Sequence, residues 1–242
     1  MQIIKLNATS STNEYFKQML SVNSIEDFTV VVTDNQTNGR GQMGTKWISE
    51  SGKNLTFSVL KNDLNLDALQ QFKLNIAVSI ALYDALQTFN IPNLYIKWPN
   101  DILSANHKIC GVLIENILVG SRIQQSIIGI GLNVNQILFD NLPNVSSLKL
   151  LLGKNFDLDA LLEEILFHLK KYVTNDFLHA DKSINLYTEK LFRLDKPSTF
   201  KNENDELFMG FIKGISPYGK LKVMLEDEIL KEFDLKEIKL LY

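Results

Sequence analysis

The sequence predicts an α+β fold in which helices pack on one mixed or antiparallel sheet, followed by a small C-terminal unit of short strands. Of the 242 residues, 45% are hydrophobic and 22% are charged, which is typical of a globular protein with a substantial core. Two long segments carry apolar residues at helical spacing, and the apolar runs between them have the length of strands. We therefore expect one domain over residues 1–194 and a second over 195–242, the second being small enough to need support from the first.

Composition restricts the class of protein. A net charge of −3 argues against bulk nucleic-acid binding, which usually needs a strong basic excess. The single cysteine, Cys110, cannot form an intrachain disulfide and fits a reducing compartment. The first residues lack the apolar core of a signal peptide, and no window reaches the roughly 20 apolar residues that cross a bilayer. We expect a cytoplasmic protein without a membrane segment.

The first third of the chain should contain a helix, two strands and a glycine-rich loop. The helix begins at Ser10 or Ser11, since Glu14 follows Ser11 at the spacing of a capping box. Residues 28–33, "FTVVVT", and 54–60, "NLTFSVL", are short apolar runs bounded by polar residues, as expected for strands.

Two helices and three strands should follow. The first helix covers 67–89, with Leu69, Phe72, Ile76, Ile80 and Tyr83 on one face, and the second covers 157–173. Strands are expected at 94–98, 109–119 and 125–135, the last two paired as a hairpin across Gly120-Ser121. Short strands separated by "SPYG" and "EDE" should form the C-terminal unit, which begins near Pro197.

Three glycines fall within six positions of the segment "DNQTNGRGQMGTKW", residues 34–47. Glycine admits backbone conformations and close approaches that other residues do not, so the segment is either a surface turn or a loop that closes over a ligand. It lacks the Gly-Lys-Ser/Thr of a phosphate-binding P-loop. "GRGQMG" has the spelling of a dinucleotide site, but no apolar helix follows, which disfavours a dinucleotide-dependent oxidoreductase.

Three further segments place polar residues at strand ends. "IKWPND" (96–101) ends a strand with lysine, tryptophan, asparagine and aspartate, and "GIGLNVN" (129–135) combines strand glycines with two asparagines. In "HKICGVLIEN" (107–116), a regular strand would place Lys108 with residues 110, 112 and 114, and Glu115 on the other face with Ile109, Gly111 and Leu113. A carboxylate there requires a partner. The three histidines lack metal-ligand spacing, so we predict no metal site in the protein.

Taken together and in order, these segments resemble the catalytic domain of the biotin–protein ligases. The matching motifs are "STN" (11–13), "GRGQMGTKW" (39–47), "KWPND" (97–101), "KICGVLIE" (108–115) and "GIGLNVN" (129–135). The resemblance implies a class II synthetase-like catalytic domain followed by a small SH3-like β-barrel. It also implies a two-step reaction, in which biotin and ATP give biotinyl-5′-AMP and the biotinyl group then passes to a lysine. The implied acceptor is a biotin carboxyl carrier protein or the carrier domain of a biotin-dependent carboxylase.

The resemblance also assigns residue roles. Catalytic roles fall to Arg40 and Lys108, which stabilise phosphate charge, and to Asp101, which orients the incoming lysine or a metal-bound water. Mg²⁺ is expected on the ATP oxygens, with few protein ligands. The implied biotin-binding residues are Ser11, Thr12, Asn13, Gln36, Gly39, Arg40, Gly41, Gln42, Trp47, Lys108 and Gly111. The implied ATP-binding residues are Arg40, Lys97, Asn100, Lys108, Gly131 and Asn133.

The chain departs from the pattern of these ligases in two respects. Gln42 and Thr45 stand where the family often has arginine, so the adenylate should depend more on Arg40 and Lys108. Many relatives also carry an N-terminal DNA-binding domain; because the motifs begin at Ser11, we expect the monofunctional form and no specific nucleic-acid binding. A homodimer is possible. The alternatives are a lipoate–protein ligase of the same fold and a non-catalytic biotin-binding protein.

Overall fold

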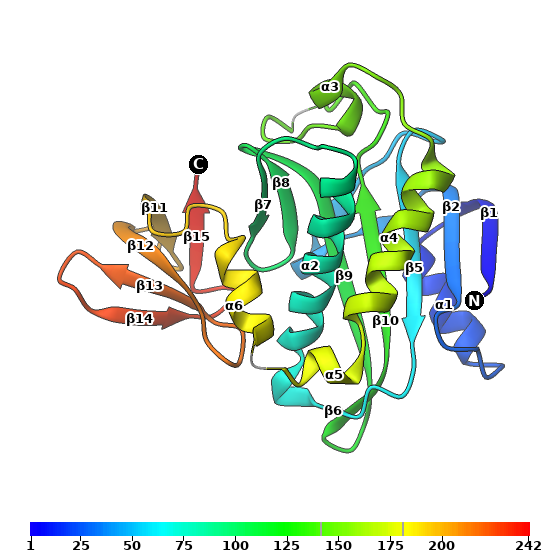
Figure 1. Cartoon of the computed structure of the whole chain (residues 1–242), viewed down its shortest axis with the longest axis horizontal. Coiled ribbons are helices and arrows are strands. Elements are labelled where there is room, and N and C mark those ends of the chain that lie inside the picture. The colour runs from blue at the N-terminus through cyan, green and yellow to red at the C-terminus, as the bar shows by residue number, and fades with distance from the viewer. Residues whose placement is uncertain (141, 181) are drawn as a thin grey trace.

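The computed structural model describes residues 1–140, 142–180 and 182–242. Its centre is an eight-stranded sheet of order β1-β2-β5-β10-β9-β8-β7, with β6 paired to β10 (Figure 1). Only β1 and β2 run parallel; the other neighbours are antiparallel. The strands are β1 (Ile3–Thr9), β2 (Val30–Gln36), β5 (Leu55–Lys61), β6 (Leu66–Asp67), β7 (Leu94–Lys97), β8 (Asp101–Ser104), β9 (His107–Val119) and β10 (Arg122–Leu132).

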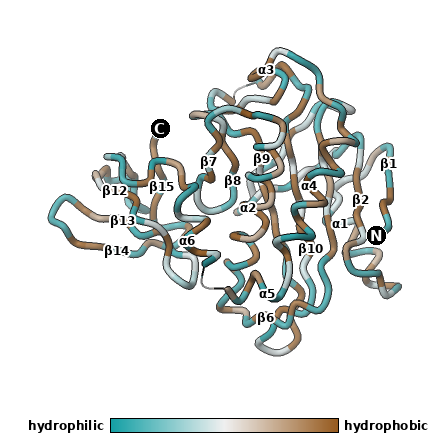
Figure 2. The backbone as a smooth tube through the Cα atoms, viewed as in Figure 1, coloured by the Kyte–Doolittle hydropathy of each residue, from teal (hydrophilic) through white to brown (hydrophobic). Residues whose placement is uncertain are grey.

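Helices cover both faces of this sheet. The long helices α2 (Phe72–Thr88) and α4 (Leu158–Tyr172) cover one face, where strand residues such as Ile128 and Ile130 join them in the main core. In Figure 2 the central strands and α2 are largely brown, the colour of hydrophobic residues. On the other face, Phe16 of α1 (Thr12–Leu20) packs against Ile127 in a smaller core. The shorter helices are α3 (Leu148–Leu152), α5 (Asn175–Leu178) and α6 (Lys182–Glu189), with 3₁₀ turns η1 (Gln42–Gly44) and η2 (Ala68–Gln70).

Most predicted elements of the first 194 residues are confirmed, including the hairpin of β9 and β10 and the helix over 157–173, which is α4 and has Asp157 as its N-cap. The structure also contains β1 and β8, for which the sequence analysis predicts no strand. The predicted helix 67–89 begins only at Phe72, because β6 and η2 occupy its first residues. Leu69 is consequently 72% exposed rather than on the buried face.

The C-terminal unit is a five-stranded antiparallel sheet of order β14-β13-β12-β11-β15. Phe200, Phe208 and Phe233 stack in its interior. The unit contacts the rest of the protein, since the Trp98 indole donates to the Gly219 carbonyl at 2.8 Å. Its strands are β11 (Pro197–Asn202), β12 (Leu207–Ile215), β13 (Leu221–Leu225), β14 (Leu230–Phe233) and β15 (Ile238–Leu241).

Replacing Gly219 with alanine should loosen this contact. Gly219 has φ +86° and a Cβ there would lie 2.0 Å from Cγ of Phe72, so either Phe72 or the turn must move. We expect unfolding free energy to fall by about 3 kcal/mol, measured by urea denaturation. Gly120→Ala is the matched control, since φ is +62° there but nothing lies within 4 Å. Equal losses in both variants would show that backbone strain alone is responsible.

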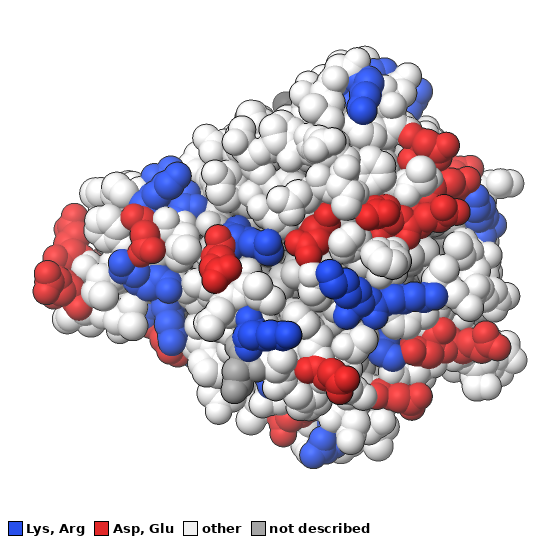
Figure 3. Space-filling view, viewed as in Figure 1, with Lys and Arg blue, Asp and Glu red and all other residues white. Residues whose placement is uncertain are grey.

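The surface over α2 and α4 carries charges of both signs, interspersed rather than segregated (Figure 3). Within the described ranges, no helix has the length and apolar character needed to cross a membrane.

Candidate functional site

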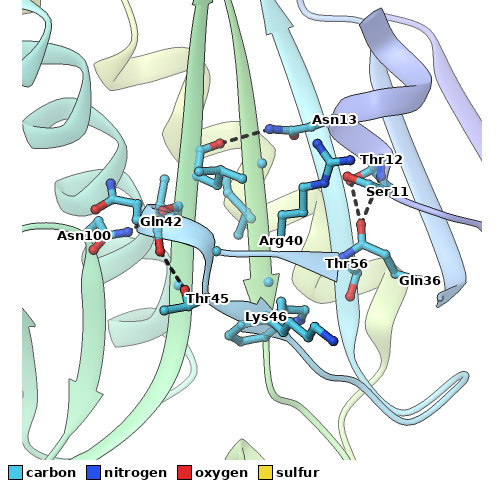
Figure 4. A pocket seen from close by; sticks show the side chains of 18 of the residues that line it. Ser11, Thr12, Asn13, Gln36, Arg40, Gln42, Thr45, Lys46, Thr56 and Asn100 are labelled. Atoms are coloured by element: carbon cyan, nitrogen blue, oxygen red, sulfur yellow. Dashed lines mark hydrogen bonds between the residues drawn. The ribbon is translucent and has the colours of Figure 1, made fainter. Parts of the chain in front are cut away.

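A pocket lies on the face of the central sheet opposite α2 and α4. Its floor is formed by β9, β10 and β5, its side by the start of α1, and its cover by the glycine-rich segment after β2 (Figure 4). Within that segment, β3 (Gly39–Arg40) pairs with β4 (Lys46–Trp47). Motifs from distant parts of the chain therefore meet in one cavity.

Glycines make the floor flat. Gly131 of β10 pairs with Gly111 of β9 on one side and with Thr56 of β5 on the other. A Cβ on Gly131 would lie 2.3 Å from the Trp47 ring, and one on Gly111 would lie 3.4 Å from it. The indole of Trp47 thus rests directly on strand backbone, and its buried Nε1 has no hydrogen-bond partner among the described residues.

A β-bulge turns Lys108 into this pocket. Ile102 of β8 pairs with Cys110 and Leu103 pairs with Lys108, which leaves Ile109 as an extra residue in β9. The extra residue reverses the alternation, so the regular-strand expectation for this end of β9 is wrong. Ile109 is buried in the main core, whereas Lys108 lies beside Gly111 and lines the pocket.

Lys108 belongs to a short row of charges at the pocket's edge. Its Nζ lies 2.6 Å from Asp101 Oδ1, and Asp101 Oδ2 lies 4.0 Å from Nζ of Lys97. Burial lowers the pKa of Lys97, an effect that Asp101 partly opposes. Lys97 itself faces the ring of Tyr242, at 4.9 Å, and a second cavity beside the C-terminal sheet.

The start of α1 supplies the polar end of the pocket. Ser11 occupies the N-cap position, but its side chain makes no capping hydrogen bond and lines the pocket instead. An N-cap serine normally stabilises its helix by about 1 kcal/mol, so leaving the hydroxyl unused points to a ligand role. The predicted capping box is therefore wrong. Gln36 Oε1 partly replaces the missing cap, because it accepts a hydrogen bond from the Thr12 amide at 3.0 Å.

The glycine-rich cover carries Arg40 over the opening. Arg40 Nη1 lies 3.7 Å from Glu14 of α1, a loose contact of a largely exposed side chain. Figure 4 shows Arg40 extending toward Asn13. The loop is closed on itself, since the Gly41 amide donates to the Thr45 carbonyl at 2.7 Å and the Thr45 hydroxyl to the Gln42 carbonyl at 2.8 Å. Arg40 can thus leave Glu14 without breaking the loop.

Most of the residues predicted from the sequence meet in the pocket, and three do not line it. Gly39 lies just behind, against Trp47 and Gln36; Lys97 touches the pocket only through Asp101; and Asn133 is buried, donating to the Ser146 carbonyl at 3.1 Å. The predicted residues that line the pocket are Ser11, Thr12, Asn13, Gln36, Arg40, Gly41, Gln42, Trp47, Asn100, Asp101, Lys108, Gly111 and Gly131.

Seven lining residues were not assigned to the site from the sequence. They are Thr45, Lys46, Thr56, Val112, Leu113, Gly129 and Ile130. Gly129 carried a signal, because a strand glycine marks close approach: its Cβ would lie 2.5 Å from Asn13 Oδ1. Five of the others lie inside the motifs 39–47, 108–115 and 129–135 but have ordinary side chains. Thr56 lies outside every motif and reaches the site only because β5 pairs with β10.

Few of the described side chains suit a role as a catalytic nucleophile or as a metal ligand. Complete burial raises the pKa of the Cys110 thiol, which makes it inert at neutral pH. Across residues 1–140, 142–180 and 182–242, no three His, Cys, Asp or Glu side chains form a group able to hold a metal. The pocket instead offers three cations (Arg40, Lys46 and Lys108), an aspartate and a buried polar end, a set suited to an anionic ligand with a polar head.

Comparison with known proteins gives a consistent result. The model of the biotin/lipoate A/B protein ligase family matches residues 6–133. The bifunctional ligase/repressor BirA of Bacillus spizizenii is 32% identical over 193 residues, covering 77% of this chain and 58% of that protein. The biotin–[acetyl-CoA-carboxylase] ligase of Paracoccus denitrificans is 36% identical over 106 residues, 43% of each chain. The present chain therefore spans a little over half the length of the Bacillus protein.

Solved structures agree over nearly the whole chain. The biotin protein ligase from Aquifex aeolicus in complex with biotin and ATP has a TM-score of 0.82 at 26% identity, covering 99% of this chain and 98% of that one. The predicted α+β fold is thereby confirmed, and the C-terminal five-stranded sheet is compatible with a small SH3-like barrel.

Proposed function

Because the chain belongs to the biotin/lipoate A/B protein ligase family, we propose that it activates biotin with ATP and transfers it to a lysine of a carrier domain. The observation that carries the proposal is the pocket itself, which joins a buried polar end at α1 to the cations Arg40 and Lys108. Related proteins named as biotin–[acetyl-CoA-carboxylase] ligases support a carboxylase carrier as the acceptor. Cytoplasm remains the expected location.

The two ends of the pocket suit the two ends of biotin. A ureido ring carries both N–H donors and a carbonyl acceptor, and the buried end offers side chains of Ser11, Thr12 and Gln36 that can match them. The apolar part of the ligand would lie on the glycine floor beside Trp47. Its carboxylate would then point to Arg40 and Lys108, whose charges suit an anion.

Adenylation requires the carboxylate oxygen to attack the α-phosphorus of ATP, with pyrophosphate leaving. Negative charge builds on the phosphoryl oxygens, where Lys108 and Arg40 would stabilise it. In the second step the amine of the acceptor lysine attacks the acyl carbon and AMP leaves. No covalent enzyme intermediate is needed, so the main contributions are positioning and charge stabilisation.

Asp101 is suited to two parts of this sequence. Its carboxylate holds Lys108 at 2.6 Å and thereby fixes the ammonium in the pocket. In the second step it would orient the incoming lysine amine and accept its proton. Asn133, which does not line the pocket, would support the adenine side from within the fold: its Nδ2 donates to the Ser146 carbonyl at 3.1 Å, and its buried Oδ1 has no partner among the described residues.

Mg²⁺ would act mainly through ATP. Asp101 is the only carboxylate among the residues that line the pocket, and it already pairs with Lys108. Such a site fits an ion that keeps several waters and binds phosphate oxygens, as Mg²⁺ usually does. When bound, the ion would neutralise part of the triphosphate charge.

The test is pyrophosphate release from purified protein with Mg-ATP and either biotin or lipoate, followed by transfer to a purified carboxylase carrier domain. We expect release with biotin and a mass increase on one carrier lysine. Release with lipoate alone would favour a lipoate–protein ligase. Measurable biotin binding without release of pyrophosphate would favour a non-catalytic biotin-binding protein.

Gln42 allows a test of whether the glycine-rich segment that covers the pocket contacts the adenylate. Gln42 lines the pocket but carries no charge, so Gln42→Arg should add an attraction to the adenylate phosphate. We expect the adenylate to dissociate about five to ten times more slowly, the effect of roughly 1 kcal/mol of added charge-assisted hydrogen bonding. Release is measured by stopped flow with labelled biotin, and Gln42→Met serves as the neutral control. Identical rates in Gln42→Arg and the native protein would show that position 42 does not contact the adenylate.

A further inference from the structure

Asn13, between the pocket and β9, has its amide orientation fixed by its partners. Asn13 is only 4% exposed, and its Nδ2 lies 2.8 Å from Glu115 Oε2 and 3.3 Å from the Leu113 carbonyl oxygen. Neither a carboxylate nor a carbonyl can donate, so the amide nitrogen must face both. Lys17 Nζ donates to the other oxygen of that carboxylate, Glu115 Oε1, at 2.7 Å. Figure 4 shows the contact of Asn13 with the main chain of β9.

This orientation determines where the proton of Ser58 points. Asn13 Oδ1 can only accept, and it lies 2.6 Å from the Ser58 hydroxyl oxygen. Ser58 is fully buried and has one proton, which must therefore go to Asn13. The same hydroxyl oxygen lies 2.7 Å from Thr12 Oγ1. With its own proton committed, Ser58 can only accept from Thr12.

The Thr12 hydroxyl can therefore accept a further hydrogen bond, but it has no proton left to donate. Its hydroxyl proton is used toward Ser58, while the longer contact to Gln36 Oε1, at 3.4 Å, is too weak to compete. Thr12 lines the pocket, so the atom it presents to a ligand is an acceptor. Gln36 is fixed the opposite way, since its Oε1 accepts from the Thr12 amide and its NH₂ group remains the donor.

We propose that Glu115 is a positioning residue which, through Asn13 and Ser58, forces Thr12 to act as the acceptor of a ligand N–H. The proposal rests on the proposed function, since it assigns that N–H to the ureido ring of biotin. The site would select against a ligand of the same shape that has an acceptor in that place, because two acceptors would then face each other in a buried setting.

The test compares biotin with its two cyclic-carbamate isosteres, in each of which one ring N–H is replaced by oxygen. Affinities are measured by calorimetry, and the readout is the ratio of the dissociation constants of each isostere and biotin. In the native protein, one isostere should bind about a hundredfold more weakly than biotin, since a site built to hydrogen-bond a group strongly rejects an analogue lacking it. The ratio of the two dissociation constants does not change when a variant only loses stability, because biotin and the isostere are then weakened equally.

Two variants interrupt, at different links, the chain of hydrogen bonds that runs from Glu115 through Asn13 and Ser58 to Thr12, which we call the relay. Ser58→Ala frees the Thr12 hydroxyl to donate, and should reduce the ratio at least tenfold. Glu115→Met leaves Asn13 held by the Leu113 carbonyl alone, and should reduce the ratio by a smaller factor. Lys17→Met is the control: it removes the neighbour of Glu115 but keeps the carboxylate, so the ratio should stay at the native value.

The outcomes separate the two proposals. If both variants weaken biotin and the isosteres equally, Glu115 and Ser58 merely support the fold and the relay is wrong. The relay is also wrong if the native protein releases pyrophosphate with biotin but shows no preference against either isostere. If the native protein does not bind biotin, the proposed function fails and the relay fails with it.

Discussion

Replacing Lys108 with alanine should lower the rate of biotin-dependent pyrophosphate release about a hundredfold or more. Lys108 is the cation that β9 places inside the pocket, 2.6 Å from Asp101, and removing one preorganised group that stabilises developing charge typically costs a factor of about 100–1,000. The rate is measured under saturating biotin and ATP with a coupled pyrophosphate assay. Biotin binding without ATP should fall much less, because the polar end of the pocket at α1 is untouched.

A matched control is available in the C-terminal sheet. Lys213 also pairs with an aspartate, Asp195, at 2.6 Å, but far from the pocket. Lys213→Ala should leave pyrophosphate release unchanged. A Lys108→Ala protein that keeps near-native turnover would show that Arg40, or Lys97 through a shift of Asp101, carries the phosphate charge instead.

Gly131→Ala should lower biotin affinity roughly tenfold to hundredfold. The added methyl would meet three atoms of the Trp47 indole at 2.3–2.7 Å, so the ring and the cover must lift from β10. Overpacking of this kind costs about 1–3 kcal/mol. Affinity is measured by calorimetry, with the thermal midpoint followed in parallel to separate lost binding from lost folding.

Trp47→Ala supplies the control for this prediction. In that background the ring is absent, so Gly131→Ala should have little further effect on biotin affinity. The two substitutions are in contact and should therefore be strongly non-additive. Additive losses would mean that the methyl acts on the ligand or the strand rather than on Trp47.

The sequence predicted the pocket better than it predicted the sheet beneath it. The motif residues were found because unusual residue types stand close together in the chain, as at Arg40 and its flanking glycines. Thr56 was missed because nothing local distinguishes it; it reaches the site through pairing of β5 with β10. The edge strand β1 was missed although residues 4–9, "IKLNAT", alternate between apolar and polar types as a half-buried strand does, so the sequence did carry a signal for it.

The error at Lys108 has a different cause. Alternation along a strand is a reliable rule only while pairing is regular, and the extra residue at Ile109 is a property of β8 and β9 together. Glu115 illustrates the opposite case. Its carboxylate was expected to need a partner, and it has two, Asn13 and Lys17.

The extra residue in β9 also limits how this protein can be redesigned. Deleting Ile109 to obtain an ideal strand would restore regular pairing and leave Lys108 on the pocket face with Gly111, but it would remove a fully buried side chain from the core beneath α2. A more regular sheet would thus be obtained at the expense of packing in the dry interior. Stabilisation of this fold should therefore be sought in the C-terminal barrel or the exposed helix faces, with the irregular pairing of β8 and β9 kept as it is.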